Sequence, residues 1–298
     1  MSSAGVPAEA ERRLTSRAFS SALTVPDFAA CLDMGLRPVG LVQGFCVMKW
    51  SWYGAGSAYM RGPYGSRSGW GTTLSTYQCP HGYGYGVGQD HRSWGENFEQ
   101  PWLSSVWQDG YNAAYQRMVA EASEAGAHGV VGVVDTTSQL VDAGIREFHL
   151  LGTAVVAEGV PPPPHVWSTY LAGQRLTKLV EAGFVPVSVV AAISSIRVWE
   201  VCETEILMRG GYDTWGVVQP GGAVPQVADA HMEARRRARD QIKRSLGGNV
   251  LHGVTVEAAE HELGEGDREV TCVIRGNSVR REREAEALAT PVPTVRLS

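Results

Sequence analysis

The hydrophobic pattern of the chain predicts two long amphipathic helices, one in each half. From Trp102 to Ala125 apolar residues recur at steps of three and four, which places them on one face of a helix. Gly126 follows, at a position where glycine commonly ends a helix. A second stripe repeats the first in phase, 120 residues later (Ala114 to Ala234, for instance). It consists of Ala223, Val227, Ala230, Ala234, Ala238, Ile242, Ser245 and Leu246.

Shorter elements are expected around both helices. Thr24 can cap a short helix that has Pro26 in its first turn, and Gly35 can take the left-handed position after it. A strand is predicted over residues 37–50. Apolar strands then follow each long helix, separated by polar loops at 135–144 and 257–266. The strands are expected at 130–134, 147–156, 250–256 and 269–279. Both halves therefore have the predicted order α-β-α-β-β.

The similarity of the halves extends to the residues themselves. Residues 32–42 align with 180–190 at an offset of 148, as from Gly35 to Gly183. Further on, Gly132 aligns with Gly253 at an offset of 121, and residues 152–155 align with 276–279 at an offset of 124. The difference between 148 and 121 gives the first copy 27 extra residues. The sequence thus predicts a tandem repeat with an insertion within residues 51–100.

Each copy is predicted to be an α+β unit: a small three-stranded antiparallel sheet with a long helix on one face. Such a unit leaves sheet edges unpaired and one face uncovered, so it favours pairing or ring formation. We expect a flexible N-terminus (1–20), the first repeat (21–157), a proline-rich linker (158–167), the second repeat (168–281) and a charged, flexible tail (282–298).

Composition narrows the function classes. The chain is 44% hydrophobic and 19% charged, which is typical of a globular protein. The net charge of −5 gives no reason to expect a nucleic-acid partner, although Arg235–Arg244 is locally basic. No apolar run approaches the roughly 20 residues of a membrane span, and the first 30 residues lack the apolar core of an export signal. Five scattered cysteines suit a reducing compartment, so a cytoplasmic protein is predicted.

Three segments of the first copy resemble a known family. They are GLVQG (40–44), AEASEAGAHGVVGV (120–133) and REFHLLGTAV (146–155), and together they resemble the YbjQ-like domains, which are labelled as heavy-metal-binding. The second copy matches less well. The resemblance implies a dodecin-like α+β fold and a pentameric ring in which strands are contributed across neighbours; it implies no known reaction. His128 stands where the family usually has an acidic residue, and the insertion is not part of the usual domain.

The insertion is rich in aromatic residues and glycine. Aromatic side chains offer large contact area at little entropic cost, so we expect a protein interface, either within the homo-oligomer or with another protein. The alternatives are a locally packed loop and a small-ligand pocket. The candidate interface residues are Trp50, Trp52, Tyr53, Trp70, Tyr83, Tyr85 and Trp94.

Candidate chemistry is sparse. The compact donor set Cys79, His81 and His91 could bind a transition or heavy metal ion. No P-loop, nucleophile elbow or His-Glu-x-x-His motif is present, so no catalytic residue and no cofactor is predicted. The sequence favours a non-enzymatic, self-assembling protein that forms a ring or larger particle through its sheet edges and its insertion. The alternative is a module that binds a heavy metal or a small ligand.

Overall fold

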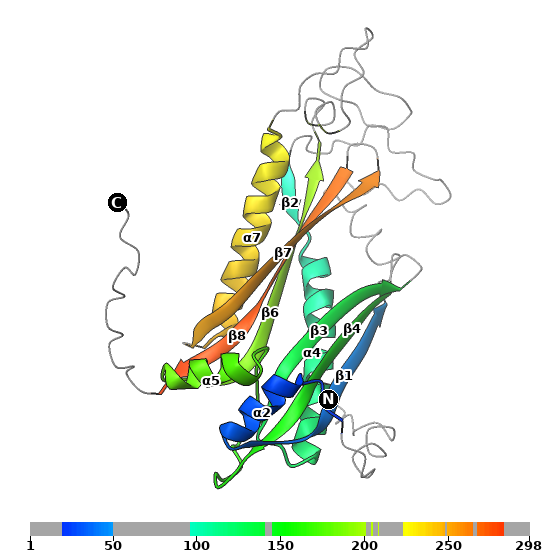
Figure 1. The fold of residues 1–298 in the computed structure, drawn as a ribbon. Helices are drawn as coiled ribbons and strands as arrows, with labels where there is room; N and C mark the ends of the chain where they lie inside the picture. The colour runs from blue at the N-terminus through cyan, green and yellow to red at the C-terminus, as the bar shows by residue number, and fades with distance from the viewer. Residues whose placement is uncertain are drawn as a thin grey trace, which may run out of the picture.

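The computed structural model describes residues 20–49, 96–140, 145–200, 204, 208, 223–247, 249–264 and 267–282. The helices are α2 (Val25–Asp33), α4 (Pro101–Glu124), α5 (Gly173–Glu181) and α7 (Pro225–Ser245) (Figure 1). The strands are β1 (Leu36–Lys49), β2 (Asn97–Glu99), β3 (Gly129–Leu140), β4 (Ile145–Ala157), β5 (Trp167–Ser168), β6 (Phe184–Trp199), β7 (Val250–Gly264) and β8 (Asp267–Arg281). The predicted α+β class is confirmed.

The short helices begin and end as their sequence indicates. The Thr24 hydroxyl accepts a hydrogen bond from the Asp27 amide at 3.4 Å, and Pro26 lies in the first turn of α2. After the helix, Gly35 adopts a φ of 72°, and Gly183 does the same after α5 with a φ of 84°. Residues other than glycine rarely adopt this left-handed backbone conformation, so glycine favours the end of both helices at these positions.

The strands form two sheets with corresponding strand orders. In the first sheet the order is β1-β4-β3-β5, and in the second it is β2-β6-β8-β7. The three long strands of each sheet are antiparallel. The prediction of three strands per sheet needs a correction, because β5 adds to β3 and β2 adds to β6. Each short strand lies across the boundary between the halves and completes the other half's sheet.

The predicted polar loops at 135–144 and 257–266 were wrong for most of these residues. Strand β3 continues through Leu140, where Thr136 pairs with His149, and β7 continues through Gly264. Polar side chains are compatible with a strand wherever one face of the paired ribbon is open to solvent, and this pairing decided the outcome here. Residues 141–144 and 265–266 lie outside the described part.

Helix α4 lies between the two sheets and joins them in one core. Trp107 and Met118 of α4 belong to a buried cluster that includes Phe148 of the first sheet and Ile193 of the second. Helix α7 covers the opposite face of the second sheet, where Ile242 packs in a cluster with Cys272 and other residues. The layers therefore follow the order first sheet, α4, second sheet, α7 (Figure 1). Helices α2 and α5 pack together over the ends of both sheets.

The close approach of α4 to β1 requires a glycine. A Cβ atom at Gly44 would overlap the main-chain carbonyl of Ala114 on α4. We expect Gly44→Ala to lower the free energy of unfolding by about 2 kcal/mol, because helix and strand must move apart. Gly40→Ala on the same strand is the control, since a Cβ there meets nothing within 4 Å. Urea denaturation measures both; equal stability of the two variants would contradict this packing.

Candidate assembly interface

The residues that the sequence singled out for a site all lie between 50 and 95, outside the described residues. They are Trp50, Trp52, Tyr53, Trp70, Tyr83, Tyr85 and Trp94 for an interface, and Cys79, His81 and His91 for a metal. These assignments stay predictions. The described residues instead show how one half of the chain binds the other, an arrangement that sequence reasoning did not detail.

The segment 168–171, just before α5, covers the outer edge of β3. The Thr169 amide donates to the Val130 carbonyl at 2.9 Å, and the amides of Gly132 and Val133 donate to the carbonyls of Leu171 and Thr169, both at 3.0 Å. Gly132 and Val133 form a bulge in β3, which turns their amides away from β4 and toward this segment. The edge of the first sheet is therefore closed by residues from the second half.

The same segment is also fastened to its own sheet. The Asn277 side-chain oxygen on β8 accepts bonds from the Thr169 hydroxyl (2.9 Å) and the Tyr170 amide (2.7 Å). The Thr169 hydroxyl in turn accepts from the Leu171 amide at 3.0 Å. Ser168 accepts from the Val189 amide of β6 at 3.0 Å. Segment 168–171 thus bonds to both sheets at once.

Two tyrosines of α4 complete the contact. Tyr111 and Tyr170 share a hydroxyl hydrogen bond of 2.9 Å, and Tyr115 bonds to the Ser168 hydroxyl at 3.1 Å. Burial raises the pKa of Tyr111 well above its usual range and raises that of Tyr170 as well. Both hydroxyls therefore remain protonated and act as neutral hydrogen-bonding groups.

A buried ion pair crosses the same boundary. Arg275 of β8 donates to Asp135 of β3 at 2.5 Å, and each side chain is only 11% exposed. Arg275 also bonds to Glu257 of β7 at 2.6 Å. Tyr170 donates to Asp135 at 3.5 Å, which links the ion pair to the tyrosines. A buried charge needs such partners, so this pair fixes the relative position of the two halves.

The two outermost long strands, β1 and β7, differ in whether other residues bond to their outer edges. On β1, Arg117 of α4 donates to the Phe45 carbonyl, and Glu121 of α4 accepts from the Gln43 amide at 3.0 Å. Glu121 is buried, so its carboxylate occupies this edge of β1 from inside the protein. Along β7, no described residue pairs with the outer edge. Three valines of β7 are also about half exposed: Val250 at 50%, Val254 at 48% and Val256 at 47%.

Side chains that could bind a metal are dispersed in the described part of the chain. No group of three histidine, cysteine or acidic residues gathers there. His128 accepts a bond from the Ala157 amide at 3.2 Å, and His149 lies 3.4 Å from the Gln43 side chain. Cys31 and Cys272 are buried, and burial raises the pKa of both thiols. The contacts of these two histidines and the burial of these two thiols are those of structural residues.

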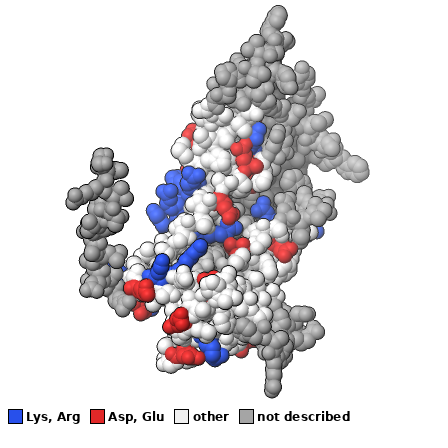
Figure 2. Space-filling model, viewed as in Figure 1, with Lys and Arg blue, Asp and Glu red and all other residues white. Residues whose placement is uncertain are grey.

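The basic residues of α7 lie on the protein surface (Figure 2). Arg236 and Arg237 bind Glu233 at 2.6 and 2.5 Å, and together they lower the pKa of its carboxyl to about 2. Arg237 also contacts Glu99 of β2. Acidic partners thus neutralise part of this surface. Among the residues described, no helix is long and apolar enough to cross a membrane.

Part of the chain is similar to a family model, and nearly all of it is similar to a known protein. The YbjQ family model, described as "Putative heavy-metal-binding", matches residues 99–158, which include α4, β3 and β4. The chain is also similar to the encapsulin nanocompartment protein Rv1762c of Mycobacterium tuberculosis. The two are 24% identical over 297 residues, which cover 97% of this chain and 96% of the relative. The similarity to the relative therefore extends over both halves.

The ion pair between the halves gives a test of their junction. Arg275→Met leaves the Asp135 carboxylate buried without its cation, and we expect it to cost about 3 kcal/mol of unfolding free energy. Arg280→Met is the control, because its pair with Glu282 is more than half exposed and is worth at most about 1 kcal/mol. Chemical denaturation measures both. An Arg275→Met loss no larger than the control would show that the pair does not hold the halves together.

Proposed function

We propose that the protein is a non-enzymatic, self-assembling protein that forms a homo-oligomeric ring or a larger particle in the cytoplasm. Its unit is a pair of tandem YbjQ-like modules, each with the order α-β-α-β-β. One observation carries the proposal: β3 has its outer edge closed by the other half, whereas its counterpart β7 has no such cover among the described residues. Open strand edges with exposed apolar side chains favour association with another chain.

Two further features support assembly. The similarity to an encapsulin nanocompartment protein covers nearly the whole chain, so it includes both modules and the region between them. The outer face of the first sheet also carries exposed apolar residues, among them Phe45 at 45% and Val47 at 46%. Such a face is costly on an isolated domain and is typical of a surface that binds a partner.

Native mass spectrometry tests the proposal directly. We expect the purified chain of 32.1 kDa to be present as one multi-copy species whose mass is a whole multiple of this value, as in a pentamer-like ring. Multi-angle light scattering over a range of concentrations provides an independent mass. A single-chain mass under both methods, with intact circular dichroism, would refute self-assembly.

The aromatic insertion is expected to contribute to the assembly. Removal of residues 57–95 deletes Trp70, Tyr83, Tyr85 and Trp94 and should lower the assembled mass or the assembled fraction in light scattering. The thermal unfolding temperature checks that the remaining chain still folds. An unchanged assembly would show that the insertion is no part of the interface between subunits.

A second candidate function is metal binding through the insertion. The family description favours it, and Cys79, His81 and His91 are the donors that the sequence supplies. This function requires stoichiometric metal in the purified protein, and a Cys79→Ser, His81→Ala variant should lose it in elemental mass spectrometry. Cys272→Ser is the control, since that thiol is buried beneath α7. Metal-free wild-type protein that also fails to take up added Zn²⁺ would exclude this function.

A further inference from the structure

The segment before α2 repeats the segment before α5, 148 residues earlier in the chain. Residues 20–23 are Ser-Ser-Ala-Leu, and residues 168–171 are Ser-Thr-Tyr-Leu. Thr153 of β4 bonds to the Ser21 hydroxyl (3.2 Å) and to the Ala22 amide (3.1 Å), as Asn277 bonds to Thr169 and Tyr170. The Leu23 amide donates to the Ser21 hydroxyl at 3.1 Å, as Leu171 does to Thr169. The two segments are therefore built and anchored alike.

In the described part of the chain, only the second of these segments covers a strand edge. Segment 168–171 covers β3, and the counterpart of β3 in the second half is β7. The β3 bulge at Gly132, with a φ of 61°, recurs in β7 at Gly253, with a φ of 62°. In β3 the bulge amides donate to segment 168–171, whereas no described residue accepts from the matching amides of Gly253 and Val254. Strand β7 therefore has the same bulge as β3, with an edge that no described residue covers. Residues 20–23 are built like the segment that covers β3.

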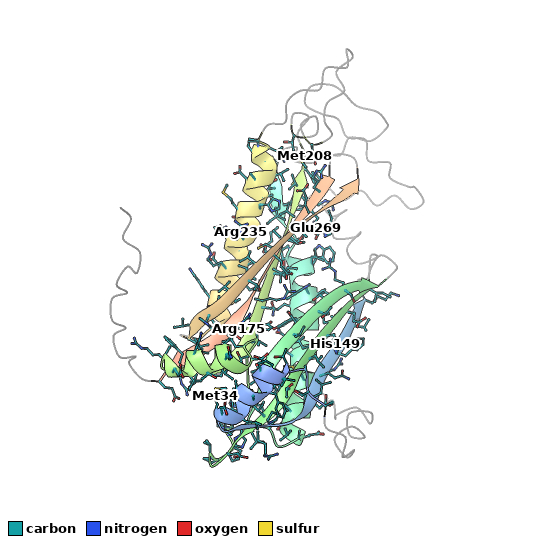
Figure 3. All side chains as sticks on the ribbon, viewed as in Figure 1. Met34, His149, Arg175, Met208, Arg235 and Glu269 are labelled. Atoms are coloured by element: carbon teal, nitrogen blue, oxygen red, sulfur yellow. The ribbon has the colours of Figure 1, made fainter. Side chains whose placement is uncertain are left out.

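The layer order supplies a second, independent match. Because the layers alternate as sheet, helix, sheet, helix, one outer surface is a sheet face and the other is the face of α7 (Figure 1). Inside the chain a sheet face packs on a helix: Ile193 of β6 is buried in the α4 cluster. Its counterpart on the first sheet is Phe45, 148 residues earlier, which is 45% exposed. In Figure 3, Arg235 on α7 and His149 on the first sheet lie on different sides of the molecule.

The side chains at the matching positions are also complementary. Within the chain, Asp135 and Arg275 form the buried ion pair of the junction. The counterpart of Asp135, 121 residues later, is Val256, and the counterpart of Arg275, 124 residues earlier, is Leu151. An oppositely charged pair is thus replaced by two apolar residues. Burial of both valine and leucine is favourable, whereas replacement of only one would have left a charge without a partner.

From these matches we infer that the chain binds a second copy of itself head to tail: residues 20–23 of one copy add to β7 of another, and the outer face of the first sheet packs on the partner's α7. The junction between the two halves is thereby repeated between chains. This inference rests on the proposed self-assembly and names its surfaces. The two surfaces differ, so the contact is heterologous and propagates until the copies close into a ring.

The interface is tested by replacing the apolar residues Val256 and Leu151 with the charged residues found at the matching positions inside the chain. Val256→Asp and Leu151→Arg, each alone, should weaken association at least ten-fold in analytical ultracentrifugation, because each places an unpaired charge in the contact. The double variant carries both charges on one chain and should assemble again, since it recreates the Asp135–Arg275 pair between copies. Val160→Asp is the control, at an apolar residue that is 57% exposed and outside the proposed contact. Circular dichroism confirms the fold of each variant.

A disulfide cross-link tests the strand pairing independently of stability. Val130 pairs with Ser168 inside the chain, so Leu251 of one copy should lie beside Ser20 of the next. Co-expressed chains that carry only Ser20→Cys and only Leu251→Cys should form a disulfide-linked dimer on mild oxidation. Ser20→Cys with His261→Cys is the control, because position 261 lies ten residues further along β7, roughly 33 Å away. Each single variant alone should give no such dimer.

The outcomes separate the two proposals. A single-chain mass for the wild-type protein overturns self-assembly itself. An assembled wild type whose Val256→Asp and Leu151→Arg variants assemble normally, or whose double variant is not restored, overturns this interface and leaves assembly through another surface. A cross-link at position 261 in place of 251 would equally overturn the pairing.

Discussion

The main-chain edge of β3 is the feature on which the arrangement of the halves depends. An exposed strand edge carries unpaired amide and carbonyl groups, and the protein satisfies those of β3 with residues 168–171. That segment is also tied to β8 through Asn277, so the edge of one sheet and the interior of the other share the same few residues. The segment could not leave β3 without also exposing the tyrosine hydroxyls and the ion pair that surround it.

The position of α4 follows from this contact. Once segment 168–171 holds the sheets together, the space between them is filled by α4, whose two opposite faces are both covered. Helix α7 stands in the same relation to the second sheet, but no further sheet lies over it in the described part of the chain. The difference explains the character of the two helices. The surface of α4 that faces the second sheet carries Tyr111 and Tyr115, whereas α7 has arginines at its exposed positions.

Within one chain, then, the interface between the two halves is already present. It consists of main-chain bonds at a bulged edge, a polar side chain that caps the incoming segment, and a buried pair at the centre. In the contact that we infer between copies, the main-chain bonds are kept, and Val256 and Leu151 stand in place of the buried charges. The similarity to a nanocompartment protein extends over both halves.

Local interactions made much of the fold predictable. The Thr24 cap, the glycines after the helices and the apolar stripes of α4 and α7 depend on residues close in sequence, and the structure has them where the pattern indicated. The loops predicted at 135–144 and 257–266 failed because a polar stretch becomes a strand only if a partner strand pairs with it. The burial of Glu121 likewise depends on tertiary structure, because its carboxylate accepts a hydrogen bond from the Gln43 amide of β1, 78 residues away in the chain.

The sequence by itself therefore determined the helices, the presence and order of the long strands in both halves and the α+β class, because capping, glycine conformation and hydrophobic periodicity act over a few residues. Only the tertiary structure decided the exchange of β2 and β5 between the halves, the position of α4 between two sheets, and which edge is closed by which segment. These depend on main-chain groups, which every residue carries and which leave no signature in the sequence. The pairing of Asp135 with Arg275, 140 residues apart, was likewise invisible until the fold brought them together.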